Sequence, residues 1–233
     1  MLEPRAPAQP SRPLLERRAL AIDAYDVLKG MVLDRRVEPG GRMAIDVLAA
    51  ELGVSQTPIR EALARLESDG IVQRSSNGRY HAASYLTEEE FNYLFDVRLQ
   101  LEPFSAAQAA SKISEAELVE LTRLDGEMRD APTGGVYEEF GPFAALNSKF
   151  HELIAAATRN PFLVQATERL HSHHRIAQLY YRRGVIDAPH AVAEHGRILS
   201  AIRRRDRDDA AEQMRWHIER SRQELRPLSH MNR

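Results

Sequence analysis

Apolar residues recur at helical spacing along most of the chain, and this pattern predicts a protein built mainly from α-helices. In the first third, apolar stripes predict helices over 17–36, 46–52 and 56–69. The period then changes, because residues 71–74 and 79–83 have strand-like patterns on either side of Asn77-Gly78, a typical hairpin turn. After Thr87 no strand pattern returns, and helices are predicted over 87–111, 114–130, 142–157, 161–183, 189–205 and 206–226.

This change of pattern predicts two domains joined by a short linker at 84–87. The three helices and the hairpin of residues 17–83 fit a winged helix-turn-helix, whereas residues 88–226 form an all-α helical bundle. Residues 1–16 contain four prolines and few large apolar groups, which is typical of a disordered arm. Residues 227–233 are expected to form a tail after the last helix. The expected fold class is therefore mainly α.

Composition excludes several classes of protein. The 233 residues include 32 Lys and Arg against 34 Asp and Glu, and no cysteine. No window is apolar and long enough to span a membrane, and the first residues hold no signal-peptide run. We therefore expect a cytoplasmic protein with no membrane partner. Without thiolates, any bound metal must depend on histidine, carboxylate or amide ligands.

The first domain carries residues suited to reading DNA. The turn Leu52-Gly53-Val54 joins two short helices, and the second exposes Gln56, Thr57 and Arg60 opposite its apolar face. In a helix-turn-helix this end enters the major groove, where Gln56 and Arg60 can contact base edges, while Arg79 on the hairpin can reach the backbone or minor groove. The alternative is a generic helical domain with solvated arginines, because residues 17–83 hold ten basic against nine acidic residues.

The segment VLAAELGVSQTPIREALARLESDGIV resembles the winged-helix domain of the GntR superfamily of bacterial transcriptional regulators. The resemblance implies that the DNA-reading helix includes Ser55, Gln56, Thr57 and Arg60, and that Gly78 with its neighbours forms the wing. This chain has Gln56 where the family usually has arginine, and Asp46 where a basic residue is common. Since glutamine suits adenine and arginine suits guanine, we hypothesise an altered operator preference.

Three histidines and one amide in the second domain suggest a metal site. Asn147 and His151 are spaced i, i+4, so they can face the same cavity. His195 and His217 lie on apolar stripes, each eleven residues from Asp206, so in an antiparallel hairpin they lie level. That level is about 16 Å from the turn. Such a set suits zinc, nickel or a similar divalent ion, although each histidine alone is more simply explained as a core residue.

Arg98 lies in an apolar stripe with Phe91, Leu94 and Leu101, so it needs an anionic partner. That partner is either Glu102, one helical turn later, or the carboxylate of a bound ligand. The nearby residues His171, His173 and His174 either line the same cavity or are solvated, and we favour solvation. Tyr180 and Tyr181 are expected to be packing residues.

The segments VRLQLEPFSAAQAA and LNSKFHELIAAATRNPFL resemble the FCD effector domain of the FadR subfamily within GntR. The resemblance implies a helical bundle that often binds a divalent metal through one Asp and three His, with a small carboxylic acid completing the coordination. His151, His195 and His217 match the three histidines, and Arg98 matches an arginine that faces the effector. Asn147 stands at the Asp position, where a neutral amide is a weaker ligand.

These observations predict a ligand-responsive transcriptional regulator that binds a palindromic operator as a homodimer and responds to a small organic acid. A metal-dependent hydrolase using the histidines is an alternative, but it needs a nearby general base. The closest carboxylates in sequence, Glu152 and Glu194, are expected to point away from their immediate neighbours His151 and His195. A non-specific architectural DNA-binding protein is a further alternative, to which a nearly neutral chain is poorly suited. We do not expect an enzyme.

Overall fold

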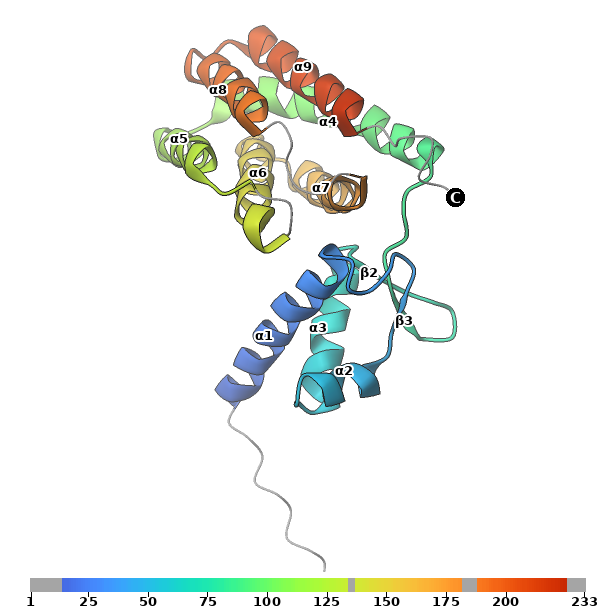
Figure 1. Cartoon of the computed structure of the whole chain (residues 1–233). Coiled ribbons are helices and arrows are strands. Elements are labelled where there is room, and N and C mark those ends of the chain that lie inside the picture. The colour runs from blue at the N-terminus through green and yellow to red at the C-terminus, as the bar shows by residue number, and fades with distance from the viewer. Residues whose placement is uncertain (1–13, 134–136, 182–187, 226–233) are drawn as a thin grey trace, which may run out of the picture.

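The computed structural model describes residues 14–133, 137–181 and 188–225 of the chain. Figure 1 shows a small body that contains α1 to α3 and the strands, and a larger helical body that contains α4 to α9. One extended segment leads from the last strand into α4. The fold is mainly α, as the sequence pattern predicted. No described helix is long and apolar enough to cross a lipid bilayer.

The small body is a winged helix. Its helices are α1 (Leu14–Leu33), α2 (Ile45–Glu51) and α3 (Gln56–Ser68), and its strands are β1 (Arg42–Met43), β2 (Val72–Arg74) and β3 (Tyr80–Ala82). The antiparallel sheet has the order β1-β3-β2, with β2 and β3 as the predicted hairpin. Strand β1 was not predicted, because two residues are too few to show an alternating pattern.

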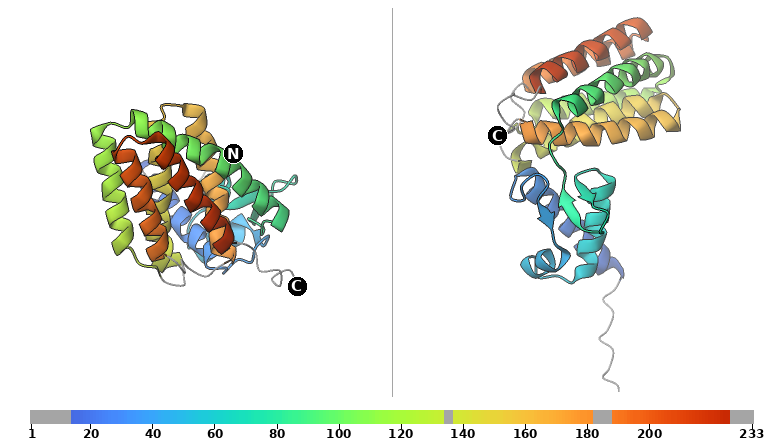
Figure 2. Two further views of the ribbon diagram at one scale, coloured as in Figure 1. Left: turned by 90° about the horizontal axis from the view of Figure 1, so that it is seen from above. Right: turned by 90° about the vertical axis from the view of Figure 1, so that its right-hand side faces the viewer.

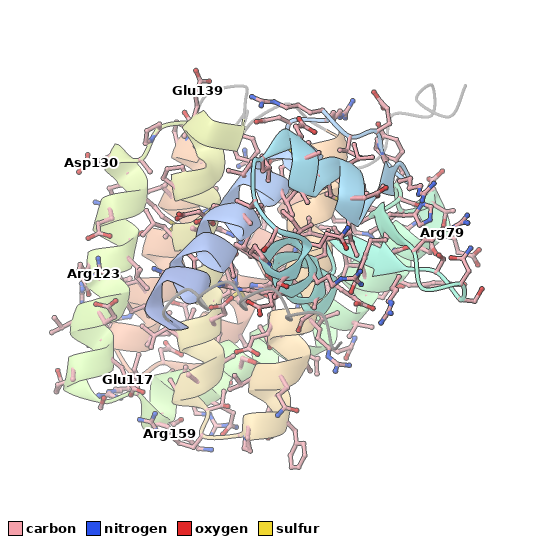
Figure 3. All side chains as sticks on the ribbon, turned by 90° about the horizontal axis from the view of Figure 1, so that it is seen from below. Arg79, Glu117, Arg123, Asp130, Glu139 and Arg159 are labelled. Carbon is pink, nitrogen blue, oxygen red and sulfur yellow. The ribbon has the colours of Figure 1, made fainter. Side chains whose placement is uncertain are left out.

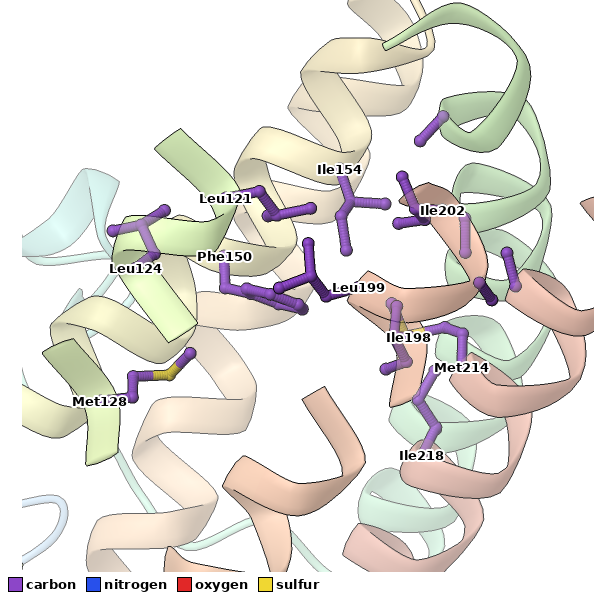
Figure 4. Packing of buried hydrophobic residues seen from close by; sticks show 14 of the residues in the cluster. Leu121, Leu124, Met128, Phe150, Ile154, Ile198, Leu199, Ile202, Met214 and Ile218 are labelled. Atoms are coloured by element: carbon purple, nitrogen blue, oxygen red, sulfur yellow. The ribbon is translucent and has the colours of Figure 1, made fainter. Parts of the chain in front are cut away.

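The larger body is a six-helix bundle of α4 (Glu88–Lys112), α5 (Glu115–Asp130), α6 (Tyr137–Ala157), α7 (Pro161–Tyr181), α8 (Ala188–Arg203) and α9 (Arg207–Leu225). Helix α4 packs along α9 and also contacts α6, α7 and α8, so it is central to the bundle (Figure 2). The apolar core includes Phe150 and Ile154 of α6 facing residues of α5, α8 and α9 (Figure 4). A capping box of Thr87 and Glu90 begins α4.

Some predicted boundaries were wrong. Helix α1 begins at Leu14, inside the predicted arm, and most of that arm and the whole tail lie outside the described residues. Helix α6 begins at Tyr137 and continues through Pro142, where the sequence pattern predicted its start. Proline costs a helix one hydrogen bond, but the side chains of Phe140 and Phe143 on either side are buried and hold the helix in place.

Helix α6 connects the two bodies. Phe140 and Ala144 belong to the apolar cluster of the winged helix, together with residues of α1 and α3. Phe143, Phe150 and Ile154 of the same helix belong to the core of the bundle. One helix therefore runs from the apolar cluster of the small body into the core of the larger body, so the two bodies are joined by α6 as well as by the segment at 84–87.

Candidate functional site

The structure brings His151, His195 and His217 together in the interior of the bundle, from α6, α8 and α9 respectively. The ring centroids lie 5.3 Å apart for His151 and His195, 5.2 Å for His151 and His217, and 4.6 Å for His195 and His217. One nitrogen of each ring lies within 4.8 Å of the others. We call these three residues the histidine triad.

Asn147 lies one turn before His151 on α6 and is also buried, with 9% of its surface exposed. The i, i+4 spacing places both side chains on one face of the helix. Asn147 is thus buried on the same face of α6 as His151, in the position that the family resemblance assigns to an aspartate.

Arg98 is 1% exposed and forms an ion pair with Glu102, whose Oε1 lies 2.6 Å from its Nε. Of the two partners considered from the sequence, the structure therefore shows the intrahelical one. The same carboxylate reaches two further rings, with Oε2 2.8 Å from His151 Nδ1 and Oε1 3.2 Å from His171 Nε2. Burial alone would raise the pKa of Glu102, but Arg98, His171 and His151 hold it well below its usual range.

The prediction for His171 was wrong, because its side chain is buried beside Glu102 and His151 rather than solvated. The buried residues Leu163, Thr167 and His171 are spaced at i, i+4 and i+8, so they form one stripe of α7 that faces inward. This spacing is the sequence signal that could have found it. The side chains of His173, His174, Tyr180 and Tyr181 lie outside the described part of the structure.

Glu194 contacts His217, a residue with which the sequence pattern had not paired it. Its side chain is buried, and its Oε2 accepts a hydrogen bond from His217 Nδ1 at 2.8 Å. Neighbouring residues of a helix point about 100° apart. Glu194 can therefore face α9 while His195 faces the triad. The Arg220 Nε and Arg197 Nη2 atoms lie 3.4 Å and 3.8 Å from Glu194 Oε1.

The triad is electrically neutral at pH 7. Burial lowers the pKa of His151 to about 4, and it also lowers the pKa values of His195 and His217. A neutral imidazole is the form that binds metal ions. Among the described residues, neither nitrogen of His195 has a hydrogen-bond partner. Arg98 Nη1 also lacks a hydrogen-bond partner among these residues. Because buried polar atoms without partners are rare and cost about 1–3 kcal/mol each, these atoms indicate a site built for a ligand.

The donor set fits a divalent transition metal. Three imidazole nitrogens and one amide oxygen are ligands of the type that zinc and nickel accept. Glu102, His151 and His171 form a second compatible group that shares His151 with the triad. Arg98 makes this second group less suited to a cation, because its guanidinium already contacts Glu102.

The predicted DNA-reading residues lie at the start of α3. Ser55 precedes the helix without a side-chain capping bond, and Gln56, Thr57 and Arg60 are exposed. Arg60 Nη2 donates a hydrogen bond to Gln56 Oε1 at 3.3 Å, so these two side chains present one polar surface. Pro58, on the opposite side, is buried in the apolar face of the helix.

The predicted wing is the turn between β2 and β3. Gly78 has φ +78°, a value that glycine adopts without strain, and the Asn77 side chain accepts hydrogen bonds from Ser75 and from the Arg79 backbone. The Arg79 side chain is exposed, and Figure 3 shows it on the edge of the molecule formed by the hairpin. This geometry leaves Arg79 free to approach a nucleic acid.

Two family models match these two bodies. Residues 20–81 match the family described as bacterial regulatory proteins, gntR family, and residues 93–220 match the FCD domain. The chain belongs to the GntR family. It is a DNA-binding transcriptional regulator with an FCD domain and not an enzyme, which confirms the family and the function class expected from the sequence.

Curated relatives cover most of this GntR-family chain. It is 27% identical over 194 residues to an uncharacterized HTH-type transcriptional regulator, YdhC, of Bacillus subtilis (strain 168), covering 83% of this chain and 85% of that protein. It is 23% identical over 205 residues to the HTH-type transcriptional repressor GlaR of Escherichia coli (strain K12), covering 85% of this chain and 92% of that protein. Among solved structures, E. coli McbR/YncC has the same fold, with a TM-score of 0.68, 21% identity and coverage of 88% and 96%.

Proposed function

We propose that this regulator binds a palindromic operator as a homodimer, and that a small carboxylic acid bound with a divalent metal in the bundle changes its affinity for DNA. The observation that carries the proposal is the buried, neutral histidine triad, whose His195 nitrogens have no hydrogen-bond partner among the described residues. FCD domains are often associated with metals, and the residues present fit one. A homodimer doubles the few base contacts that a single small module can make.

The metal would be held by the triad and Asn147, and zinc or nickel fits this donor set best. When bound, such an ion supplies a positive centre that attracts a carboxylate. The neutral amide of Asn147 does not offset that positive charge. The site therefore favours an anionic ligand.

Arg98 supports the proposed binding of an acid. Its Nε holds Glu102, but its Nη1 is buried without a hydrogen-bond partner among the described residues. A ligand carboxylate could therefore accept a hydrogen bond from Nη1 while the ion pair with Glu102 stays in place. The two partners considered for Arg98 from the sequence are thus compatible with each other.

Helix α6 provides a path from this site to the DNA-reading body. It carries Asn147 and His151, and one and two turns before Asn147 it carries Ala144 and Phe140, which pack in the winged-helix cluster. A ligand changes DNA affinity only if it binds one arrangement of the two bodies better than another. Ligand contacts to one end of α6 can favour one such arrangement, because the other end is fixed in the second body.

Selection of binding sites from random DNA duplexes tests the DNA part of the proposal. The wild-type protein should enrich a palindromic sequence, and light scattering should give the mass of a dimer. The Gln56→Arg variant should enrich guanine in place of adenine at one symmetric position, because arginine pairs bidentately with guanine. At that position, the variant should prefer guanine over adenine by about 1–3 kcal/mol of binding free energy.

Thr57 and Arg60 are unchanged in this variant, so its other base preferences should match the wild type. Enrichment of no common sequence by the wild-type protein would contradict specific operator binding. An identical preferred sequence for both proteins would contradict the role assigned to Gln56.

A further inference from the structure

Two buried carboxylates lie directly behind the histidine triad, and the sequence pattern placed neither of them in the site. We propose that Glu102 and Glu194 are positioning residues of the metal site, which orient His151 and His217, and that Glu194 also supplies negative charge that Asn147 lacks. The inference rests on the metal site proposed above. It concerns how this chain compensates for the missing acidic ligand.

The contact between Glu194 and His217 is a hydrogen bond of 2.8 Å between Oε2 and Nδ1. Both side chains are buried, with 6% and 7% exposed respectively. An ionised carboxylate only accepts hydrogen bonds, so His217 carries its hydrogen on Nδ1 and keeps a lone pair on Nε2. Ligating histidines in proteins are typically fixed by a carboxylate in this way, which orients the ring and makes the other nitrogen a stronger ligand.

Glu102 occupies the equivalent place behind His151. Its Oε2 lies 2.8 Å from His151 Nδ1. This distance suits a hydrogen bond, although the His151 N–H does not point directly at the oxygen. Its Oε1 is paired with Arg98 Nε at 2.6 Å, which holds the carboxylate in place from the side away from His151. Helix α4 thus supports the ring on α6, while helix α8 supports the ring on α9.

The charges of these groups explain how the site can tolerate an amide. Three neutral imidazoles and Asn147 offset none of the charge of a divalent ion. The charge of Glu102 is balanced by the buried Arg98, whereas the arginines near Glu194, Arg220 and Arg197, are partly exposed and lie 3.4 Å and 3.8 Å from it, so Glu194 supplies most of the negative charge next to the rings. In a buried site such charges act strongly, because little water is present to screen them. His195 stacks on Phe150, with the two ring centroids 4.6 Å apart. Among the described contacts, no carboxylate lies behind its ring.

The test compares the zinc affinity of tag-free Glu194→Gln and Glu102→Gln proteins with that of the wild type, by competition with a chromophoric chelator. Glutamine keeps the size of the side chain and removes the charge. Each variant should bind zinc about 10–100-fold more weakly, the usual effect of losing such a partner. Glu219→Gln is the matched control, because Glu219 is exposed two residues after His217 and its loss should leave the affinity unchanged.

A second measurement does not depend on metal. Imidazole nitrogen NMR of the metal-free wild-type protein should show His217 with its hydrogen on Nδ1, whereas a hydrogen on Nε2 would overturn the proposed orientation. Equal zinc affinity of wild type and Glu194→Gln would overturn the charge argument, even if Glu102→Gln failed to fold. Absence of zinc binding by the wild type would instead contradict the metal site itself, so the two failures can be distinguished.

Discussion

Replacing Arg98 by methionine should lower the free energy of unfolding of the metal-free protein by about 3–5 kcal/mol, the usual cost of leaving one member of a buried ion pair alone. Arg98 and Glu102 are 1% and 2% exposed, so water cannot replace the lost guanidinium. Without Arg98, the pKa of Glu102 should rise because burial then acts with less opposition. Urea denaturation followed by circular dichroism measures the effect.

Arg123→Met is the matched control for this variant. Arg123 also pairs with a glutamate four residues later, Glu127, but both side chains are nearly half exposed. Its replacement should change stability little, since exposed pairs contribute weakly. The double variant Arg98→Met/Glu102→Met should recover most of the loss, because it leaves no unpaired buried charge. A stable Arg98→Met protein would show that Glu102 does not need the guanidinium.

Replacing His195 by leucine should have opposite effects on stability and on metal binding. Neither nitrogen of His195 has a partner among the described residues, and the ring is fully buried. An apolar side chain of similar size removes two unsatisfied atoms, so the metal-free protein should gain about 1–3 kcal/mol in free energy of unfolding. Zinc binding should be lost, since the triad then offers only two imidazoles. Chemical denaturation and chelator competition measure the two effects.

His217→Leu distinguishes this explanation from a general tolerance of the core. It should also abolish zinc binding, but it should destabilise the metal-free protein, because the Glu194 carboxylate loses its hydrogen-bond donor. If both leucine variants destabilised the metal-free protein equally, the unpartnered nitrogens of His195 would not carry the cost assigned to them.

The sequence predicted most of the fold because its elements have clear local signals. The helix stripes and the Asn77-Gly78 turn are properties of neighbouring residues, and they located nearly every helix and the hairpin. Strand β1 and the first turn of α6 depend instead on contacts between distant segments. Residues 42 and 43 pair with β3, and Phe140 packs in the winged-helix cluster. Local patterns cannot show such contacts.

The candidate site was predicted in part for the same reason. The triad could be predicted, because His195 and His217 are equally distant from Asp206 and both lie on apolar stripes. The carboxylates behind it could not, because the direction of Glu194 depends on how closely α8 and α9 pack. Glu102 was identified only as a partner of Arg98, and its second contact, with His151, requires knowledge of how α4 and α6 meet.

We propose that a ligand in the bundle controls DNA binding through α6. The most direct test measures the dissociation constant for one selected duplex, with zinc-loaded protein and the small carboxylic acid that gives the largest thermal shift. The acid should change the constant by about 5–150-fold in the wild type and in Phe143→Ala, which loses contacts only within the bundle. In Phe140→Ala, which loosens α6 from the winged helix, the change should largely disappear. A wild-type constant that is the same with and without the bound acid would contradict the claim.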